Sequence, residues 1–322
     1  MIQNNANDLQ LNIDSKHLKP LFQTKVYRHV LAMLGDWLII ALTIGLCIQY
    51  FHPLTYLLAI LIIGARMHAL AILMHDATHY RFLKNRQWND TLTNWFTMYP
   101  IFTSIETYRE NHLRHHRHLN TEDDPDWVAK LGKRAFTFPK SKSEFLITVF
   151  SYFTLYQGIS DAIWFLKRFG GAKDGEKKKA KSSIDRPIFY LLLFVSLTLI
   201  GAWKYFLLFW VVPYLSTFFM YQYIRSVAEH FGELAYDHLL TSTRTVKPNW
   251  LERFFIAPHH VGYHLEHHLY PGVPFYHLPQ LHTLLMREQG YSEKAHVTQG
   301  YVMGLMEELG GAEYRDSEIG LG

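Results

Sequence analysis

Apolar residues gather in long runs along this chain, separated by polar stretches rich in histidine and lysine. The first two runs cover residues 31–51 and 54–74, and Pro53 stands between them. Because about 20 apolar residues are needed to cross the hydrocarbon core of a bilayer as a helix, these runs predict a transmembrane hairpin. Residues 187–203 and 204–223 predict a second hairpin that turns at Gly201–Lys204. The pattern therefore predicts an all-α integral membrane protein with four transmembrane helices.

A fifth apolar segment, Phe145–Leu166, decides the topology. Gln157 and Asp161 interrupt it. If this segment crossed the bilayer, the polar stretches before and after it would lie on opposite sides of the membrane. If it lies in the headgroup region, four crossings leave both stretches on one side. We expect the second arrangement, with the aromatic-rich residues 91–108 as another interfacial element.

Lysine and arginine indicate the orientation. Residues 75–186 hold many basic side chains, including the run Lys173–Lys181, whereas the two short turns between paired helices hold only Lys204. The positive-inside rule places the large polar loop in the cytoplasm. The N-terminal residues lack the basic and apolar regions of a cleavable signal peptide. We expect a multi-pass protein of a bacterial inner membrane with its active site on the cytoplasmic side.

Composition narrows the function further. The mean hydropathy of −0.06 is too low for a protein made mostly of membrane helix, so a sizeable part should lie outside the bilayer. A net charge of +4, without a basic stripe interleaved with aromatic residues, gives no indication of nucleic-acid binding. The single cysteine, Cys47, excludes a disulfide framework and a CxxC zinc site within this chain.

Histidine carries the chemistry of this sequence. Eight of the 20 histidines fall into three clusters, which are His75 and His79; His112, His115 and His116; and His264, His267 and His268. Spacings of three and four residues place the rings of each cluster on one face of a helix. Imidazole suits iron, zinc, copper and nickel, and eight such ligands exceed what one ion can use. The sequence therefore predicts a shared site for two metal ions.

Acidic residues near the clusters are candidates to accept hydrogen bonds from the outer ring nitrogens of these ligands. The candidates are Asp76, Glu110, Glu229, Glu266 and, in the stretch TEDDPD, Asp124. Helix caps and a proline turn are the alternative explanation for each of them.

The amino-acid sequence around the second and third clusters is distinctive. It reads YRENHLRHHRHLNTEDDPDW in residues 108–127 and YHLEHHLYPGVPFYHLP in residues 263–279. With the first cluster, it resembles the membrane fatty acid desaturase and hydroxylase superfamily over about residues 35–285. The resemblance implies a four-helix membrane stem, a helical cytosolic cap and two non-haem irons that use dioxygen as co-substrate. It makes the eight clustered histidines iron ligands.

The same resemblance implies a ninth ligand on the helix after the last transmembrane segment. His230, in the sequence RSVAEH, matches that position. In relatives, a polar residue four positions earlier, often asparagine, can contribute to metal ligation. This chain has Ser226 there, so a direct or water-mediated ligand role for Ser226 is in doubt. We expect the neighbouring His118, His259 and His260 to lie outside the ligand set.

The chain then divides into five segments. They are a polar N-terminal segment (residues 1–29), the first hairpin (30–74), the first part of the cap with interfacial helices and two clusters (75–186), the second hairpin (187–224) and the second part of the cap with the third cluster (225–322).

These features predict an O2-dependent oxidoreductase that desaturates a lipid acyl chain. No acid or base among the side chains removes hydrogen from an unactivated C–H bond, whereas a metal centre that uses dioxygen does. A hydroxylase, a carotenoid ketolase or hydroxylase and an alkene-forming fatty acid decarboxylase would share the same clusters. A zinc protease is disfavoured because Asp76 replaces the glutamate of His-Glu-x-x-His. A metal transporter or sensor is a remote alternative, because the clusters lie outside the predicted crossings.

The electron donor is expected to be a separate protein. The sequence holds no fused haem module, no cysteine set for an iron–sulfur cluster and no nucleotide-binding fingerprint. The resemblance implies a ferredoxin, a rubredoxin or a b-type cytochrome with its reductase. A lipid acyl substrate and the surrounding membrane lipids complete the expected partners.

Overall fold

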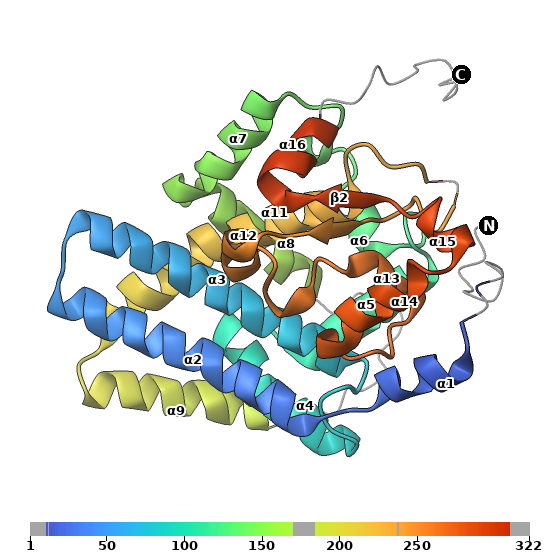
Figure 1. Ribbon diagram of the computed structural model, residues 1–322. Helices are drawn as coiled ribbons and strands as arrows, with labels where there is room; N and C mark the ends of the chain where they lie inside the picture. Colours follow the sequence, from blue (N-terminus) through green and yellow to red (C-terminus); the bar gives the residue numbers. More distant parts are fainter. Residues whose placement is uncertain (1–10, 12, 170–183, 237, 310–322) are drawn as a thin grey trace.

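The computed structural model describes residues 11, 13–169, 184–236 and 238–309, so the lysine-rich run 173–181 lies outside the described residues. The chain is mostly helical. Long helices form a stem, and shorter helices form a cap at one end of it (Figure 1). A short helix, α1 (Ser15–Leu18), and a 3-10 turn, η2 (Lys19–Phe22), lead into the stem.

The predicted first hairpin is confirmed as a pair of long helices, α2 (Val26–Gln49) and α3 (Pro53–Thr78), both apolar and long enough to cross a bilayer. The side chain of His52 caps the start of α3, and Pro53 occupies its first turn, where a missing N–H costs nothing. The helix does not end with the apolar run at residue 74. It continues to Thr78, so that the first histidine cluster lies at the end of a membrane helix.

The second hairpin is less regular than the first. Its second arm runs continuously from Trp203 to His230 through α10 (Trp203–Phe206), the π-helical turns η7 (Leu207–Val211) and η8 (Tyr214–Phe218), and α11 (Phe219–His230). Its first arm, α9 (Asp185–Leu199), has 15 residues within the described part of the chain. Because a crossing needs about 20 residues, the described residues contain three candidate spans, and the fourth remains a prediction.

The fifth apolar segment is broken in the middle. It forms α7 (Lys142–Ser151), a 3-10 turn η6 (Tyr152–Thr154) and α8 (Tyr156–Phe169). Leu155, between the turn and α8, has a φ of +64° and ends the 3-10 turn that follows α7. Neither α7, with 10 residues, nor α8, with 14, reaches the length of a crossing.

The aromatic stretch after the first hairpin packs against the stem. It comprises α4 (Arg86–Thr93), the π turn η3 (Asn94–Met98) and the 3-10 turn η4 (Tyr99–Ile101). The indole N–H groups of Trp37 and Trp210 donate to the carbonyls of Phe96 and Pro100 at 3.0 and 2.8 Å. Their rings stack with centroids 5.5 Å apart. Both hairpins therefore hold this stretch and, directly after it, helix α5 (Ile105–Arg117).

The rest of the cap surrounds the end of the stem. Its elements are α6 (Pro125–Val128), η5 (Arg134–Phe136), α12 (Trp250–Phe255), η9 (Pro258–His260), α13 (His264–Leu269), η10 (Phe275–His277), α14 (Leu278–Leu285), α15 (Gln289–Ser292), η11 (Gly300–Gly304) and α16 (Leu305–Glu308). Two short strands, β1 (Thr245–Lys247) and β2 (Val297–Gln299), pair in parallel. The sequence pattern did not predict this small sheet, because strands of three residues leave no periodic signal.

A buried charge network ties the cap to the first hairpin. Arg66 on α3 donates to Asp36 on α2 at 3.0 Å and to the backbone carbonyl of Phe254 at the end of α12. Asp36 also lies 2.7 Å from Nε2 of His259. Arg66 and Asp36 are 5% and 2% exposed, so each charge is compensated inside the protein.

Close packing of α3 against the second hairpin depends on Gly64. A Cβ atom there would lie 2.0 Å from the hydroxyl of Thr217 and 2.8 Å from the backbone nitrogen of Phe218. The Thr217 hydroxyl already donates to the carbonyl of Ile60 at 2.6 Å, so it has little room to move.

We therefore predict that Gly64→Ala lowers the free energy of unfolding by about 1–3 kcal/mol, the usual cost of an added methyl in a filled interior. Gly45→Ala is the matched control, because nothing lies within 4 Å of a Cβ at that position of α2. It should be neutral or slightly stabilising, since alanine is the better helix former. Thermal unfolding of the purified protein in detergent measures both, and equal midpoints would contradict the packing argument.

Candidate metal centre

The nine predicted ligands come from four elements that meet at the end of the stem. His75 lies in the last turn of α3, and His79 caps that helix. His230 is the last residue of α11. The second cluster lies on α5 and the third on α13. Seven of the nine side chains are buried, and His79 and His116 are partly so.

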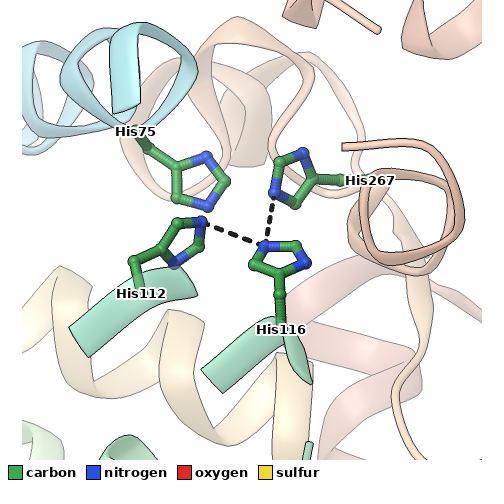
Figure 2. A group of neighbouring side chains, drawn as sticks. All are labelled: His75, His112, His116 and His267. Carbon is green, nitrogen blue, oxygen red and sulfur yellow. Dashed lines mark hydrogen bonds between the residues drawn. The ribbon is translucent and has the colours of Figure 1, made fainter. Parts of the chain in front are cut away.

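The histidines form two groups rather than one. The first comprises His75, His112, His116 and His267, whose rings point toward one another (Figure 2). His79 adjoins this group, with its Nε2 2.9 Å from that of His112. The second group comprises His115, His230, His264 and His268. Within each group of four, the potential ligand atoms lie within 4.8 Å of one another. The groups are neighbours, since the rings of His116 and His268 stack with centroids 4.3 Å apart.

The nitrogen contacts inside each group cannot all be hydrogen bonds. Nε2 of His112 lies 2.9 Å from that of His79 and 3.0 Å from that of His116. Nε2 of His264 lies 2.9 Å from that of His230 and 3.0 Å from that of His268. An imidazole nitrogen carries either one hydrogen or one lone pair, so it satisfies one such partner and not two.

A shared cation resolves this conflict. Nε2 of His75 is buried and has no hydrogen-bond partner among the described residues, as expected for a lone pair that faces an ion. The observed N–N spacings of 2.9–3.0 Å therefore suit nitrogens that would share one ion in each group.

The electrostatics also suit metal binding. Burial lowers the pKa of His79 to about 3, with smaller effects from Arg81 and Arg109. Burial lowers the pKa of five further ligands outside the membrane spans well below the ordinary value; these are His112, His116, His264, His267 and His268. At neutral pH these rings are therefore uncharged, with a lone pair ready for a metal.

Two of the predicted acids contact a ligand. Asp124 is fully buried, and its Oδ2 lies 2.8 Å from Nδ1 of His115. Its other oxygen caps α6. Glu229 lies 3.5 Å from Nδ1 of His264 and is paired with Arg225 one turn earlier on α11. The Asp124 carboxylate holds the outer nitrogen of His115, which fixes the ring orientation and raises its basicity, whereas Glu229 lies near the outer nitrogen of His264 without a hydrogen bond to it.

The remaining candidates lie elsewhere. Oδ1 of Asp76 accepts from the backbone N–H of Phe275 at 3.1 Å. Glu266 is fully buried and bonded to His282, Tyr291 and Thr245, away from the two groups. Glu110 is exposed on the outer face of α5. The hydroxyl of Ser226 is buried without a hydrogen-bond partner among the described residues.

The structure adds residues that the sequence patterns did not single out. The ring of Tyr108 stacks on that of His112, with centroids 5.1 Å apart. Arg225 pairs with Glu229, and His282 holds Glu266 in place. Tyr108 lies four residues before His112, so helical spacing could have pointed to it, whereas Arg225 and His282 have no such spacing from a ligand. His118, His259 and His260, which we expected outside the ligand set, belong to neither group.

A cavity of about 240 Å³ reaches both groups. Ligands of the first group (His75 and His112) and of the second (His115, His230 and His264) line it. One part of its wall is apolar, with Ala71, Met98, Ile101 and Phe218, and another part carries charged residues, with Asp126, Lys130, Lys133 and Asp161.

The sequence pattern that defines fatty acid desaturases matches residues 51–301. The chain belongs to the fatty acid desaturase family. It is 32% identical to a dihydrorhizobitoxine desaturase of Bradyrhizobium elkanii over 78% of this chain and 72% of that protein. A chloroplastic omega-6 fatty acid desaturase of Spinacia oleracea is 23% identical over 67% of this chain, which spans half of that protein's length. A ferredoxin-dependent sn-1 acyl-lipid omega-3 desaturase of Nostoc is 23% identical over 80% of this chain and 74% of that protein.

Family membership establishes an oxidoreductase of the desaturase type. The three long apolar helices and the membrane-bound relatives agree that this is a membrane protein. The histidine groups are the part of this fold that could hold its metal.

Replacing one acid beside a ligand tests the metal centre. We predict that Asp124→Asn weakens metal binding about 10- to 100-fold, because asparagine has one acceptor oxygen where aspartate has two. With that oxygen capping α6, the amide NH2 faces Nδ1 of His115 and the backbone N–H of Asn120, the two groups that Oδ2 of Asp124 faces. The control is Asp123→Asn, since Asp123 is exposed next to it. The two variants are compared by the metal that each chain retains at increasing concentrations of a chelator. Equal retention would contradict the role of Asp124.

The lowered histidine pKa values predict acid sensitivity. Unfolded histidine titrates near 6.5, whereas His79 in the folded chain titrates at about 3. Below pH 6.5 the unfolded chain therefore binds protons that the folded chain does not. The free energy of unfolding therefore decreases as the pH is lowered. Protons also compete with the metal for the ligands. Metal content and the unfolding midpoint should both drop as the pH is lowered from about 7.5 to about 5. If neither quantity changed over this range, the rings would not be buried and neutral.

Proposed function

We propose that this chain is a membrane-bound non-haem di-iron oxidase that desaturates a lipid acyl chain. The observation that carries the proposal is a cavity with an apolar wall that touches histidines of both groups. Imidazole nitrogen ligands suit iron, and their division into two groups suits two ions. The residues therefore fit the metal that the family uses.

Iron would supply the redox chemistry with dioxygen that breaks an unactivated C–H bond. In the overall desaturation reaction, the substrate loses two hydrogen atoms and gains one double bond. Dioxygen accepts these two hydrogen atoms, together with two electrons and two protons from outside, and is reduced to two water molecules. The protein residues then have to position one pair of carbons and keep bulk water away from them.

The cavity wall is suited to this task. Apolar side chains such as Ala71, Met98 and Ile101 favour a hydrocarbon segment and disfavour water. His75 and His112 on the same wall bring that segment beside the first group, and His230 and His264 bring it beside the second. Tyr108 stacks on His112 and limits how far this ring can turn. Desaturation needs two adjacent carbons held still, and a narrow cavity between packed helices supplies that restraint.

The topology proposal completes this assignment. Four crossings, with α7 and α8 in the headgroup region, would put every predicted ligand histidine on one side of the membrane, and the distribution of basic residues supports the cytoplasm as that side. A bacterial inner membrane is the expected location. We propose ferredoxin, rubredoxin or a b-type cytochrome with its reductase as electron donor; a relative whose name specifies ferredoxin supports the first.

A second candidate is desaturation of a small, more polar molecule. Two observations favour it. The relative from Bradyrhizobium elkanii is named for a substrate that is not a fatty acid, and four charged residues line part of the cavity. A hydroxylase, a carotenoid ketolase or hydroxylase and an alkene-forming decarboxylase would use the same metal centre and differ in product. A metal transporter or sensor is disfavoured because the ligands border a cavity suited to an organic molecule.

Lipid profiling tests the main proposal. Cells that express the intact chain should gain an unsaturated acyl species, and cells that express His267→Ala should not, because that change removes a ligand of the first group. His260→Ala is the control, since His260 belongs to neither group, and it should retain the product. An oxygenated product without a new double bond would favour a hydroxylase. Identical lipids in all strains, with a desaturated small metabolite only where the metal site is intact, would favour the second candidate.

A further inference from the structure

A patch of apolar side chains lies on the C-terminal part of the cap, which the sequence predicts to be soluble. It comprises Trp250 and Leu251 on α12 and Val302 and Met303 on η11, which are 77%, 48%, 57% and 71% exposed. We call these four residues the α12 patch. The two elements are joined because Oε1 of Glu252 accepts from the backbone N–H groups of Tyr301 and Val302, each at 2.8 Å.

The depth of this patch follows from the charge network on the stem. Asp36 lies 13 residues before Gln49, where α2 ends, and Arg66 lies 13 residues after Pro53, where α3 begins. Their contact of 3.0 Å confirms that both are at one level. At 1.5 Å per residue, that level is about 20 Å from the turn between the helices. Arg66 also bonds the carbonyl of Phe254 and lies over its ring, so α12 is fixed at the same level (Figure 1).

This level falls inside the apolar band of the stem. On α2, Leu34 and Leu31 lie two and five residues beyond Asp36 toward the cap, and they are 56% and 63% exposed. An exposed leucine stripe continues in the other direction through Leu38 and Leu42 to Leu46. Because the hydrocarbon core is about 30 Å thick, a point about 20 Å from the outer turn is still below the cytoplasmic headgroups.

We infer that the α12 patch rests in the cytoplasmic leaflet, so that the second part of the cap has its own contact with lipid. Tryptophan is the residue most typical of this boundary, and Trp250 is the most exposed member of the patch. Arg253, exposed on the same short helix, is long enough to extend from the apolar boundary to the lipid phosphates. The occupant of the patch is therefore the bilayer itself, and not water or another protein.

Spin labels in a bilayer test this inference without any assay of activity. Cys47 is the only cysteine, so Cys47→Ala provides a background for single sites. Met303→Cys and Trp250→Cys place a nitroxide in the patch. Glu293→Cys, an exposed position just after α15 at the end of the cap farthest from the stem, is the control (Figure 1). Each protein is placed in nanodiscs of phosphatidylcholine and phosphatidylglycerol, and its metal content verifies folding.

Collision of the label with apolar O2 is compared with collision with a water-soluble nickel chelate. We expect a higher ratio of O2 to nickel accessibility at positions 250 and 303 than at 293. Nickel accessibility equal to that of position 293 would overturn the inference, because the patch would face water. Low accessibility to both reagents, with dipolar broadening between labels, would also overturn it, because a second copy of the chain would then cover the patch.

Discussion

Lone pairs of buried, uncharged imidazoles converge on two small volumes, and the arrangement of the cap depends on that convergence. Nitrogen atoms 2.9–3.0 Å apart can share one hydrogen, but several have two such neighbours, so hydrogens cannot satisfy every contact and a cation between the nitrogens would. Each buried polar atom without a partner costs about 1–3 kcal/mol. A metal bound there would therefore also contribute to the energy of folding, since its ligands lie on α3, α5, α11 and α13.

Asp124 and Glu229 extend the same constraint outward. Each lies against the outer nitrogen of one ligand, and each is held in turn, Asp124 as the cap of α6 and Glu229 by Arg225. The contact with Asp124 holds the outer nitrogen of His115, so this ring keeps its orientation without a metal. Glu229 and Arg225 line the cavity, so this pair also forms part of its wall.

The sequence predicted the ligands well because helical spacing is a local property. Rings three and four residues apart must share a face, and the structure brings all nine predicted histidines together. It could not predict how they divide. His115 and His116 are neighbours in the chain yet belong to different groups, because one residue turns a helix by about 100°. The same rotation explains why Glu266 and Glu110, one or two positions from a ligand, point away, whereas Asp124 returns to His115 through a turn.

The fold was predictable to a similar extent. Apolar run lengths gave the first hairpin, but the end of α3 could not be read from hydropathy, because the helix continues past the apolar residues into the histidines. The segment Phe145–Leu166 is long and apolar enough to cross a bilayer. Its helix is nevertheless interrupted near Leu155, where φ is positive, and hydropathy does not reveal that interruption. Gly158 on α8 lies directly against the backbone of Leu215 in the second hairpin, which helps to fix where that helix sits.

The continuity of the membrane helices with the metal centre has a consequence for the modularity of this enzyme. His75 lies in the last turn of one candidate span and His230 ends another. A cut that released the cap as a water-soluble fragment would remove a predicted ligand from each group. The predicted metal centre and the membrane helices therefore form one unit, which cannot be divided between stem and cap without loss of ligands.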